Sequence, residues 1–227
     1  MSAPQLPLAL SPPRRPRFSN FVTGDNGLVV RTLRDGLEPG QWLRVSGPPG
    51  SGRSHLALAT VARLAERNLR CVFVPGAMPA AAALLEAAGG DWVVVDDYDA
   101  LAGDEARERA LFNALNRWRA DRTGVVLTGG DRSAFLLPDL RSRLGQAAHL
   151  VVKPLDDRSL EALVRQLVED YGVVAGRGLI DYLMRHGPRA AAPLAALVER
   201  MSQQALAERR VLSIPLARSC LDDPGRA

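Results

Sequence analysis

The sequence predicts a parallel α/β domain followed by a small all-helical subdomain. Short apolar segments alternate with helix-forming segments from 41 to 152, a pattern typical of a parallel sheet whose strands are joined by crossover helices. A glycine-rich loop follows the first of these apolar segments. After Pro154 the strand-like segments stop, and apolar residues recur at helical spacing.

The predicted strands are short, apolar and separated by predicted helices. The third strand contains three consecutive valines at 93–95, so we expect it to be buried on both faces. The strands are predicted at 41–45, 71–74, 92–96, 124–128 and 149–152. The helices between them are predicted at 52–68, 80–88 and 104–120.

The C-terminal part, 155–227, is predicted to form a helical lid subdomain that follows the α/β subdomain of 18–154. Leucine and valine recur at i, i+3 and i+4 between Leu160 and Tyr171, which predicts an amphipathic helix. Further helices are predicted at 176–186, 190–209 and 214–221.

Length and composition indicate a globular protein that does not enter a membrane. A chain of 227 residues is long enough for a domain of about 150 residues and a smaller lobe, and its 47% hydrophobic content supports a buried core. No apolar run approaches membrane-spanning length, and prolines interrupt the N-terminal segment where a signal peptide would be unbroken. We therefore expect a cytoplasmic protein with no membrane partner.

The basic residues are almost all arginine, since the net charge is +4 and Lys153 is the only lysine. Two explanations are open. A GC-rich genome would favour arginine codons without any function, whereas contact with nucleic acid would use the guanidinium groups to neutralise phosphates. The two cysteines, Cys71 and Cys220, are far apart in the chain and predict neither a disulfide framework nor a zinc site.

The segment GPPGSGRSH, residues 47–55, has the composition and setting of a phosphate-binding loop. It lies between a predicted strand and a predicted helix. Its glycines permit the turns that point N–H groups at an anion, and the helix N-terminus adds a favourable dipole. A chance glycine-rich turn is the alternative. The residues expected to line the loop are Pro49, Gly50, Ser51, Gly52, Arg53, Ser54 and His55.

Two residues of this loop bear on its chemistry. Arg53 stands where such loops carry lysine, and Ser54 stands where a hydroxyl would ligate Mg²⁺. A guanidinium can pair with phosphate, but it is planar and bulkier than an ammonium group. We therefore expect nucleotide binding to be retained and hydrolysis by this chain to be weak.

Polar residues follow the later strands. P-loop ATPases place paired carboxylates after an apolar strand, here Asp96 for Mg²⁺ and Asp97 for polarising the attacking water. Thr128 ends the next predicted strand and is either a sensor of the γ-phosphate or an ordinary turn residue. Arg141 and Arg143 precede the last predicted strand. Each is either a solvated arginine or an arginine finger for the nucleotide of a neighbouring subunit.

The order of these motifs resembles the AAA+ domain of the bacterial replication initiator DnaA. The segments that carry the resemblance are FSNFVTGDN, GPPGSGRSHL, VVVDDYD, LFNALNRW, LTGGDR and LPDLRSRLG, which together span essentially the whole chain. The sequence is most similar to the shortened Hda branch, the regulatory inactivators of DnaA, in which a loop arginine followed by Ser-His is typical. The resemblance implies an AAA+ fold with a helical lid, and a bound adenine nucleotide, ADP or ATP, with Mg²⁺.

The resemblance also implies roles for single residues. Phe18 and Phe21, with Asp25 and Asn26, correspond to the region around the adenine base. Asp96 and Asp97 correspond to the acidic pair, and Thr128 corresponds to the first sensor. Arg143 corresponds to an arginine finger that acts in trans on ATP bound to DnaA.

The second sensor departs from the family pattern. The helix RAAAPLAALVERM should begin with a sensor arginine, but counting back from LSIP places Ala192 at that position. Arg189 lies three residues earlier, almost one helical turn, and is therefore the candidate for this nucleotide contact.

Residues 1–17 form a proline-rich tail that we expect to act as an extended tether. Its segment QLPLAL resembles the peptide by which Hda proteins bind the sliding clamp, the β subunit of DNA polymerase III, although Ala9 stands where proline is more frequent. A glutamine would hydrogen-bond at the rim of a pocket that leucines fill. The alternative is a disordered tail. The predicted clamp-binding residues are Gln5, Leu6, Leu8 and Leu10.

The resemblance implies a regulator of replication initiation. Such a protein holds a nucleotide, docks on the clamp, reaches DNA through the clamp and stimulates hydrolysis of DnaA-bound ATP, which prevents re-initiation. A homodimer and association with the replisome are compatible with this role. The chain ends at Ala227, shortly after the predicted lid, so we expect no helix-turn-helix domain for origin binding.

Two other classes compete with this interpretation. An autonomous DnaA-like or helicase-loader-like ATPase would carry a loop lysine and a DNA-contacting element. A small-molecule kinase would need a substrate pocket and an arginine-rich lid. Neither class explains the tail.

Overall fold

The computed structural model describes residues 15–130 and 134–222. Over these ranges the chain divides into two units, an α/β unit formed by Pro16–Pro154 and a helical unit that begins at Leu155. Each unit buries its own apolar side chains. The predicted fold class, a parallel α/β domain with a small all-helical subdomain, is confirmed.

The α/β unit is built on a five-stranded sheet in which all strands are parallel. The strand order is β2-β3-β4-β1-β5. The strands are β1 Trp42–Ser46, β2 Cys71–Pro75, β3 Trp92–Asp96, β4 Gly124–Gly129 and β5 Ala148–Val151. Because β3 and β1 lie on the two sides of β4, the carboxyl ends of these three strands meet at one edge of the sheet.

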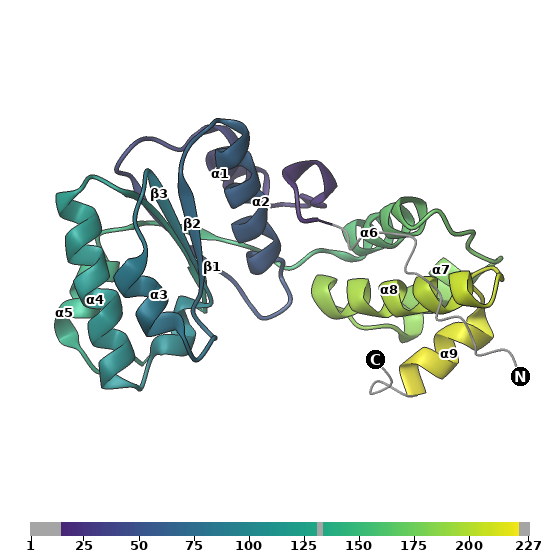
Figure 1. Cartoon of the computed structure of the whole chain (residues 1–227). Coiled ribbons are helices and arrows are strands. Elements are labelled where there is room, and N and C mark those ends of the chain that lie inside the picture. The colour runs from purple at the N-terminus through teal and green to yellow at the C-terminus, as the bar shows by residue number, and fades with distance from the viewer. Residues whose placement is uncertain (1–14, 131–133, 223–227) are drawn as a thin grey trace, which may run out of the picture. The chain divides into compact units, whose positions relative to one another are not determined.

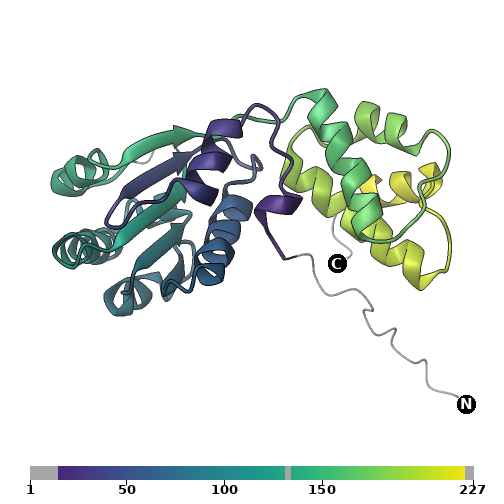
Figure 2. The ribbon, with the colours of Figure 1, turned by 90° about the horizontal axis from the view of Figure 1, so that it is seen from above.

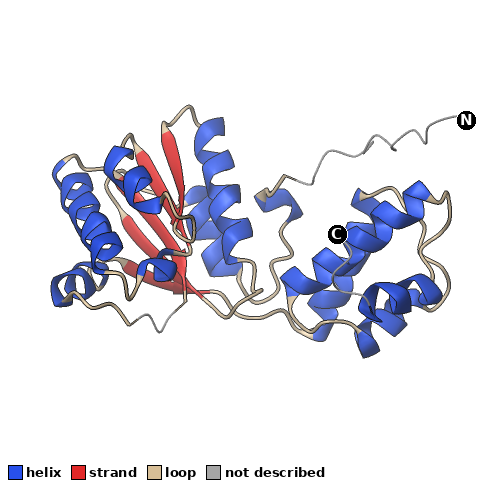
Figure 3. Cartoon of the chain, turned by 60° about the horizontal axis from the view of Figure 1, so that its bottom comes forward, coloured by secondary structure: helices blue, strands red, loops and turns tan. Residues whose placement is uncertain are grey.

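Helices cover both faces of the sheet. α1 and α2 lie on one face and α3, α4 and α5 on the other, so that the sheet is the middle layer of this unit (Figures 1, 2 and 3). The helices are α1 Gly27–Asp35, α2 Arg53–Glu66, α3 Ala81–Ala87, α4 Glu105–Ala120 and α5 Pro138–Leu144. Two short 3-10 helices, η1 Phe18–Asn20 and η2 Tyr98–Leu101, precede α1 and follow β3.

A separate apolar core fills each face. Leu33 of α1 and Leu56 of α2 are fully buried in one core, and Leu111 and Trp118 of α4 are fully buried in the other. All five residues of β3 are buried, as its run of valines predicts, because side chains on both faces of this central strand meet covering helices.

The helical unit contains four helices in the part that the structure describes: α6 Asp157–Asp170, α7 Leu179–His186, α8 Ala191–Ala207 and α9 Ile214–Asp222. Asp156 caps α6, since its Oδ1 accepts the Ser159 N–H at 2.8 Å. The stripe that predicted this helix is its buried face, formed by Leu160, Leu163, Val164 and Leu167.

The structure adds elements that the sequence pattern did not predict, namely α1, α5 and the two 3-10 helices. The predicted helix at 52–68 ends at Glu66, because Asn68 adopts a left-handed φ of 58° just beyond the helix. The predicted helix at 176–186 begins at Leu179, after Gly178 with a φ of 73°.

No helix among the described residues combines the length and the apolar character that crossing a membrane requires. The predicted clamp-binding peptide lies outside the described residues, so its side chains Gln5, Leu6, Leu8 and Leu10 stay a prediction.

Candidate phosphate-binding site

The glycine-rich loop connects β1 to α2 at the carboxyl edge of the sheet. β1 ends at Ser46 and α2 begins at Arg53. Between them, Gly50 and Gly52 have φ values of 76° and 98°, in the left-handed region that favours glycine. Gly52 is the N-cap of α2, so the free N–H groups and the positive dipole end of this 14-residue helix lie at the end of the loop.

Two close approaches explain glycines at the two ends of the loop. A Cβ on Gly47 would lie 2.8 Å from the Ser51 Oγ and 2.8 Å from the Val152 carbonyl oxygen. A Cβ on Gly52 would lie 2.8 Å from the ring of Phe21. The Ser51 Oγ is buried and has no hydrogen-bond partner, which leaves a polar atom in the loop for a ligand.

Arg53 connects the loop to the acidic pair. Its Nη1 donates to the Gly47 carbonyl oxygen at 3.1 Å, and its Nη2 lies 3.4 Å from Asp97 Oδ1. The side chain is only 12% exposed. A guanidinium presents several donors in one plane, so Arg53 contacts the loop backbone and an acid at the same time.

Asp96 and Thr128 are in direct contact. β3 pairs with β4, and Asp96 at the end of β3 accepts a hydrogen bond from the Thr128 hydroxyl. Asp96 is 8% exposed and Thr128 is fully buried. Two residues that lie 32 positions apart in the chain thus form one buried unit beside the loop.

Oxygen ligands are available for Mg²⁺ at this edge. Ser54 is exposed on the first turn of α2, and Asp96 supplies a carboxylate, the donor type that Mg²⁺ prefers. Over 15–130 and 134–222, no group of three or more His, Cys, Asp or Glu side chains is arranged to hold a metal ion. Mg²⁺ is commonly bound through one or two carboxylates together with water and substrate phosphates, so the absence of such a group does not decide for or against this metal.

Asp97 has a strained backbone and a perturbed carboxyl group. It follows β3 with a φ of 48°, which costs a non-glycine residue about 1 kcal/mol. Burial raises the pKa of Asp97, the neighbouring Asp96 and Asp99 raise it further, and Arg53 opposes them without reversing the shift. A raised pKa suits a carboxylate that accepts a proton from water.

Asp99 is a third acid at this edge, with no role predicted from the sequence. Its Oδ1 is buried without a hydrogen-bond partner. The carboxylate lies against the end of β4, since a Cβ on Gly129 would be 2.5 Å from Oδ1 and a Cβ on Gly130 would be 2.7 Å from Oδ2. Three acids within the segment DDYD were the signal that could have found it.

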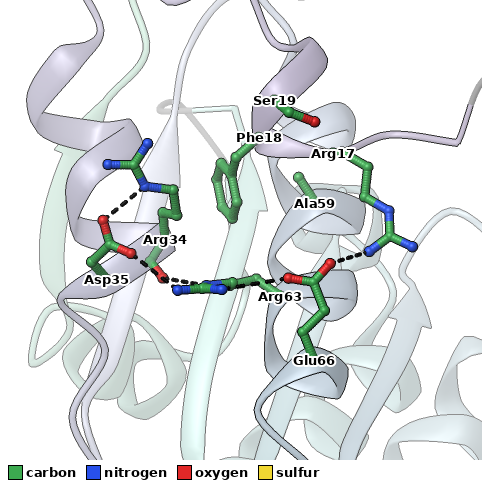
Figure 4. Close-up of a pocket in the computed structure, with 8 residues that line it drawn as sticks. All are labelled: Arg17, Phe18, Ser19, Arg34, Asp35, Ala59, Arg63 and Glu66. Carbon is green, nitrogen blue, oxygen red and sulfur yellow. Dashed lines mark hydrogen bonds and ion pairs between the residues drawn. The ribbon is translucent and has the colours of Figure 1, made fainter.

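The two predicted base-side phenylalanines lie near the loop. The Phe21 ring is 5.3 Å from the His55 ring, centroid to centroid, at an interplanar angle of 56°. Phe18 in η1 is half-buried against the core of α1 and α2. Phe21 therefore lies at the N-terminal part of α2, beside the loop, whereas Phe18 lies further along α2, near Ala59 and Arg63 (Figure 4).

Asn26 supports this region through the backbone. Its Nδ2 donates to the Lys153 carbonyl oxygen at 3.0 Å, and its Oδ1 accepts the Lys153 N–H at 2.7 Å. The amide is buried and engaged on both sides, so it fixes the start of α1. Asp25 beside it is exposed.

Arg143 lies on α5 and is held within its own unit. Its Nη2 donates to Asn116 Oδ1 of α4 at 2.7 Å, and its Nη1 donates to Gln146 Oε1 at 3.4 Å. Arg143 is half-buried, whereas Arg141 two residues earlier is exposed. A guanidinium has five N–H donors, so these two contacts leave donors for a further group.

A buried acid on α4, Glu108, fixes the segment that leads into α5. Its carboxylate accepts N–H groups from Gly103, Leu136 and Leu137 at 2.8, 2.9 and 2.9 Å. Burial alone would raise the pKa of Glu108, but these donors and the charge of Arg141 outweigh it, so that the pKa lies below its usual value. No sequence pattern marks this residue, because an acid in the first turn of a helix is ordinarily exposed.

The candidate second sensor lies before a helix. Arg189 precedes Ala190, the N-cap of α8, so Arg189 does not lie on the same helix as Ala192 and the two do not share a helical face. Its Nη1 donates to the Met184 carbonyl oxygen at 2.9 Å and lies 3.2 Å from Asp157 Oδ1. The nucleotide contact of Arg189 stays a prediction.

The sequence matches no protein-family model. The fold, however, is similar to solved structures of replication proteins. Domain III of the replication initiation protein DnaA from Thermotoga maritima superposes with a TM-score of 0.76 and 17% identity, over 91% of this chain and 95% of that chain. AMPPCP-bound DnaA from Aquifex aeolicus gives a TM-score of 0.70 and 16% identity, over 89% of this chain and 69% of that one.

A second group of similar structures is RuvB. A mutant of RuvB from Thermotoga maritima superposes with a TM-score of 0.67 and 16% identity, over 92% of this chain and 72% of that one. At these identities the comparison establishes the fold. The chain has the AAA+ fold that DnaA and RuvB share.

Proposed function

We propose that this chain is a DnaA-related AAA+ protein that binds an adenine nucleotide with Mg²⁺ and acts in DNA replication. The observation that carries the proposal is the convergence of the glycine-rich loop, Arg53, the acidic pair and Thr128 at one edge of the sheet. The fold supports it, because DnaA structures of this fold hold AMPPCP, an adenine nucleotide.

Each group at this edge has a role in holding the nucleotide. The loop backbone from Pro49 to His55 would orient the phosphates. Ser54 and Asp96 would hold Mg²⁺, which neutralises phosphate charge when bound. Thr128 fixes one carboxylate oxygen of Asp96 by its hydrogen bond.

The contacts of Arg53 support weak hydrolysis by the chain itself. Asp97 is the residue that would accept a proton from the attacking water, and here it is paired with the guanidinium of Arg53. The charge of Arg53 lowers the pKa of Asp97 against the effect of burial and the other acids, which makes Asp97 a weaker proton acceptor. Slow turnover would leave the chain holding its product, ADP.

The finer proposal is the role of the Hda branch. The chain would dock on the sliding clamp through its N-terminal peptide, reach DNA through the clamp, and present Arg143 to DnaA-bound ATP. Association with the replisome follows from clamp binding. The order of sequence motifs supports this role, and the position of Arg143 on α5, outside the chain's own phosphate loop, is compatible with it.

The experiment that tests the finer proposal measures phosphate release from DnaA loaded with labelled ATP. The full chain is added with and without clamp loaded on DNA, and Arg143→Ala is compared with Arg141→Ala. We expect acceleration that depends on the clamp, is lost in Arg143→Ala and is retained in Arg141→Ala. Nucleotide binding by this chain should be unchanged in both variants.

An autonomous DnaA-like or helicase-loader-like ATPase is the second candidate. The observation that favours it is the complete set of Asp96, Asp97 and Thr128, with the raised pKa of Asp97. In the same assay it predicts rapid ATP turnover by this chain alone and no acceleration on DnaA. That outcome would replace the regulatory role by the autonomous one.

A further inference from the structure

The segment from Arg17 to Phe21 is fixed on α2 by the backbone of Arg17. His55 Nε2 lies 3.0 Å from the Arg17 carbonyl oxygen. Because a carbonyl oxygen only accepts hydrogen bonds, His55 must carry its hydrogen on Nε2 in this contact. The bond joins the segment to α2 one helical turn or less from the phosphate loop.

The side chain of Arg17 fixes the same segment further along α2. Its Nη1 donates to Glu66 Oε1 at 2.6 Å, near the end of α2. Glu66 also lies 3.5 Å from Arg63, which reaches Asp35 of α1 at 3.4 Å. Figure 4 shows this chain of charges crossing from α1 to α2 below Phe18, around a pocket of about 390 Å³.

The other end of the segment rests on the phosphate loop itself. The Phe21 ring packs so closely on Gly52 that its Cε2 would lie 2.8 Å from a Cβ at that position. It also packs against His55. A ligand whose phosphates occupy the loop would therefore have its base close to this aromatic segment, and apolar ring faces favour planar groups.

We propose that His55 and Glu66 are positioning residues for recognition of the base. They hold Arg17–Phe21 at a fixed place on α2, and neither needs to touch the base to do so. This inference rests on the proposed nucleotide site. Recognition of the base would then depend on the segment Arg17–Phe21, and recognition of the phosphates on the glycine-rich loop.

The test compares two probes by isothermal titration of the full chain, MgATP and magnesium tripolyphosphate, which has no base. His55→Ala removes the donor and should lower the affinity for MgATP about fivefold. The affinity for tripolyphosphate should change less than about twofold. His55→Gln places an amide N–H at a similar reach and should restore most of the MgATP affinity. Glu66→Gln should lower the affinity for MgATP by only about twofold to threefold, because the ion pair of Glu66 with Arg17 is exposed and therefore weak.

A matched control is Glu105→Gln, which breaks a surface pair with Arg109 of 2.5 Å on α4 and should change neither affinity. An equal loss of affinity for MgATP and for tripolyphosphate in His55→Ala would overturn the inference, since His55 would then act on the phosphate loop. Unchanged MgATP affinity would overturn it as well. Failure of the unsubstituted chain to bind MgATP is a different result, because it removes the proposed nucleotide site itself.

Discussion

Asp97 is a residue of the candidate site whose ionised carboxylate lowers the stability of the fold at neutral pH. Its pKa is raised by burial and by Asp96 and Asp99, and only partly offset by Arg53. A carboxyl group whose pKa is higher in the folded state contributes stability below its unfolded pKa, and this contribution is lost as the pH rises through the folded pKa. At neutral pH the ionised Asp97 therefore destabilises the fold, which is common at functional sites.

Replacing Asp97 by asparagine should therefore stabilise the protein at neutral pH. The gain in free energy of unfolding should be below about 1 kcal/mol, because the side chain is 40% exposed and solvent screens its charge. The gain should vanish at about pH 3, where the carboxyl is largely protonated in both states. Urea unfolding at both pH values measures this, with the exposed Asp121→Asn as control. A gain that is equal at both pH values would show that ionisation is not its cause.

The pKa of Glu108 is shifted in the opposite direction to that of Asp97, so its effect on stability depends on pH in the opposite way. Its pKa is lowered, so its contribution to stability is present above its unfolded pKa and is lost as the pH falls through the folded pKa. Glu108→Gln puts an amide N–H₂ against backbone N–H donors and should lower the free energy of unfolding at neutral pH by about 2 kcal/mol. The difference in free energy of unfolding between Glu108→Gln and the unsubstituted chain should become smaller at acidic pH.

The matched control is Glu105→Gln on the exposed side of the same helix turn, which should cost less than about 0.5 kcal/mol. Urea unfolding across this pH range is the measurement. If Glu108→Gln is as mild as the control, the three backbone contacts do not stabilise the fold.

At the scale of elements, α4 determines where α5 lies. α5 has seven residues, too few for a helix that is stable by itself in water. Two side chains of α4 hold it: Glu108 binds the segment before its first residue, and Asn116 binds Arg143 in its last turn. The proposed arginine finger is therefore positioned by α4, the helix that packs beside it.

Removing Asn116 should loosen α5 without unfolding the unit. In Asn116→Ala the amide hydrogen exchange of α5 should accelerate about tenfold, since a hydrogen bond to a charged donor is lost. Binding of MgATP should be unchanged, because the loop and the acidic pair lie elsewhere. Asn113→Ala, exposed on the same helix, is the control. Exchange as slow as in the control would mean that Asn116 does not hold Arg143 in solution.

The elements that the sequence predicted are those whose residues signal burial by themselves. The valine run of β3 and the apolar stripes of α4 and α6 need no knowledge of their neighbours. α1 begins with glycine and has nine residues, and α5 begins with a proline. Such short helices form because the sheet and α4 cover them, which local patterns do not reveal.

At the scale of the whole molecule, the same distinction applies to the site. The loop and the acids were predictable, because the strand order of a parallel α/β fold brings strand ends to one edge. The contacts of Asn26 with Lys153 and of Asn116 with Arg143 span 127 and 27 residues. They depend on how side chains meet after folding, so the sequence alone could not show them.

The two units bury separate cores, and this gives nucleotide binding a readout in thermal unfolding. We expect two calorimetric transitions, one for each unit. A ligand at hundredfold its Kd stabilises the unit that binds it by about 2.7 kcal/mol, so MgADP should raise the transition of the α/β unit. If Arg189 also contacts the nucleotide, the transition of the helical unit should rise with it.

Arg189→Ala separates these two effects, with Arg185→Ala on α7 as an exposed control. The Arg189 variant should keep the MgADP shift of the α/β transition, because the phosphate loop is intact, and should lose the shift of the helical transition. If the helical transition does not respond to MgADP in the unsubstituted chain, Arg189 is not the second sensor. The nucleotide would then be held by the loop and the base-side segment, without a contribution from the helical unit.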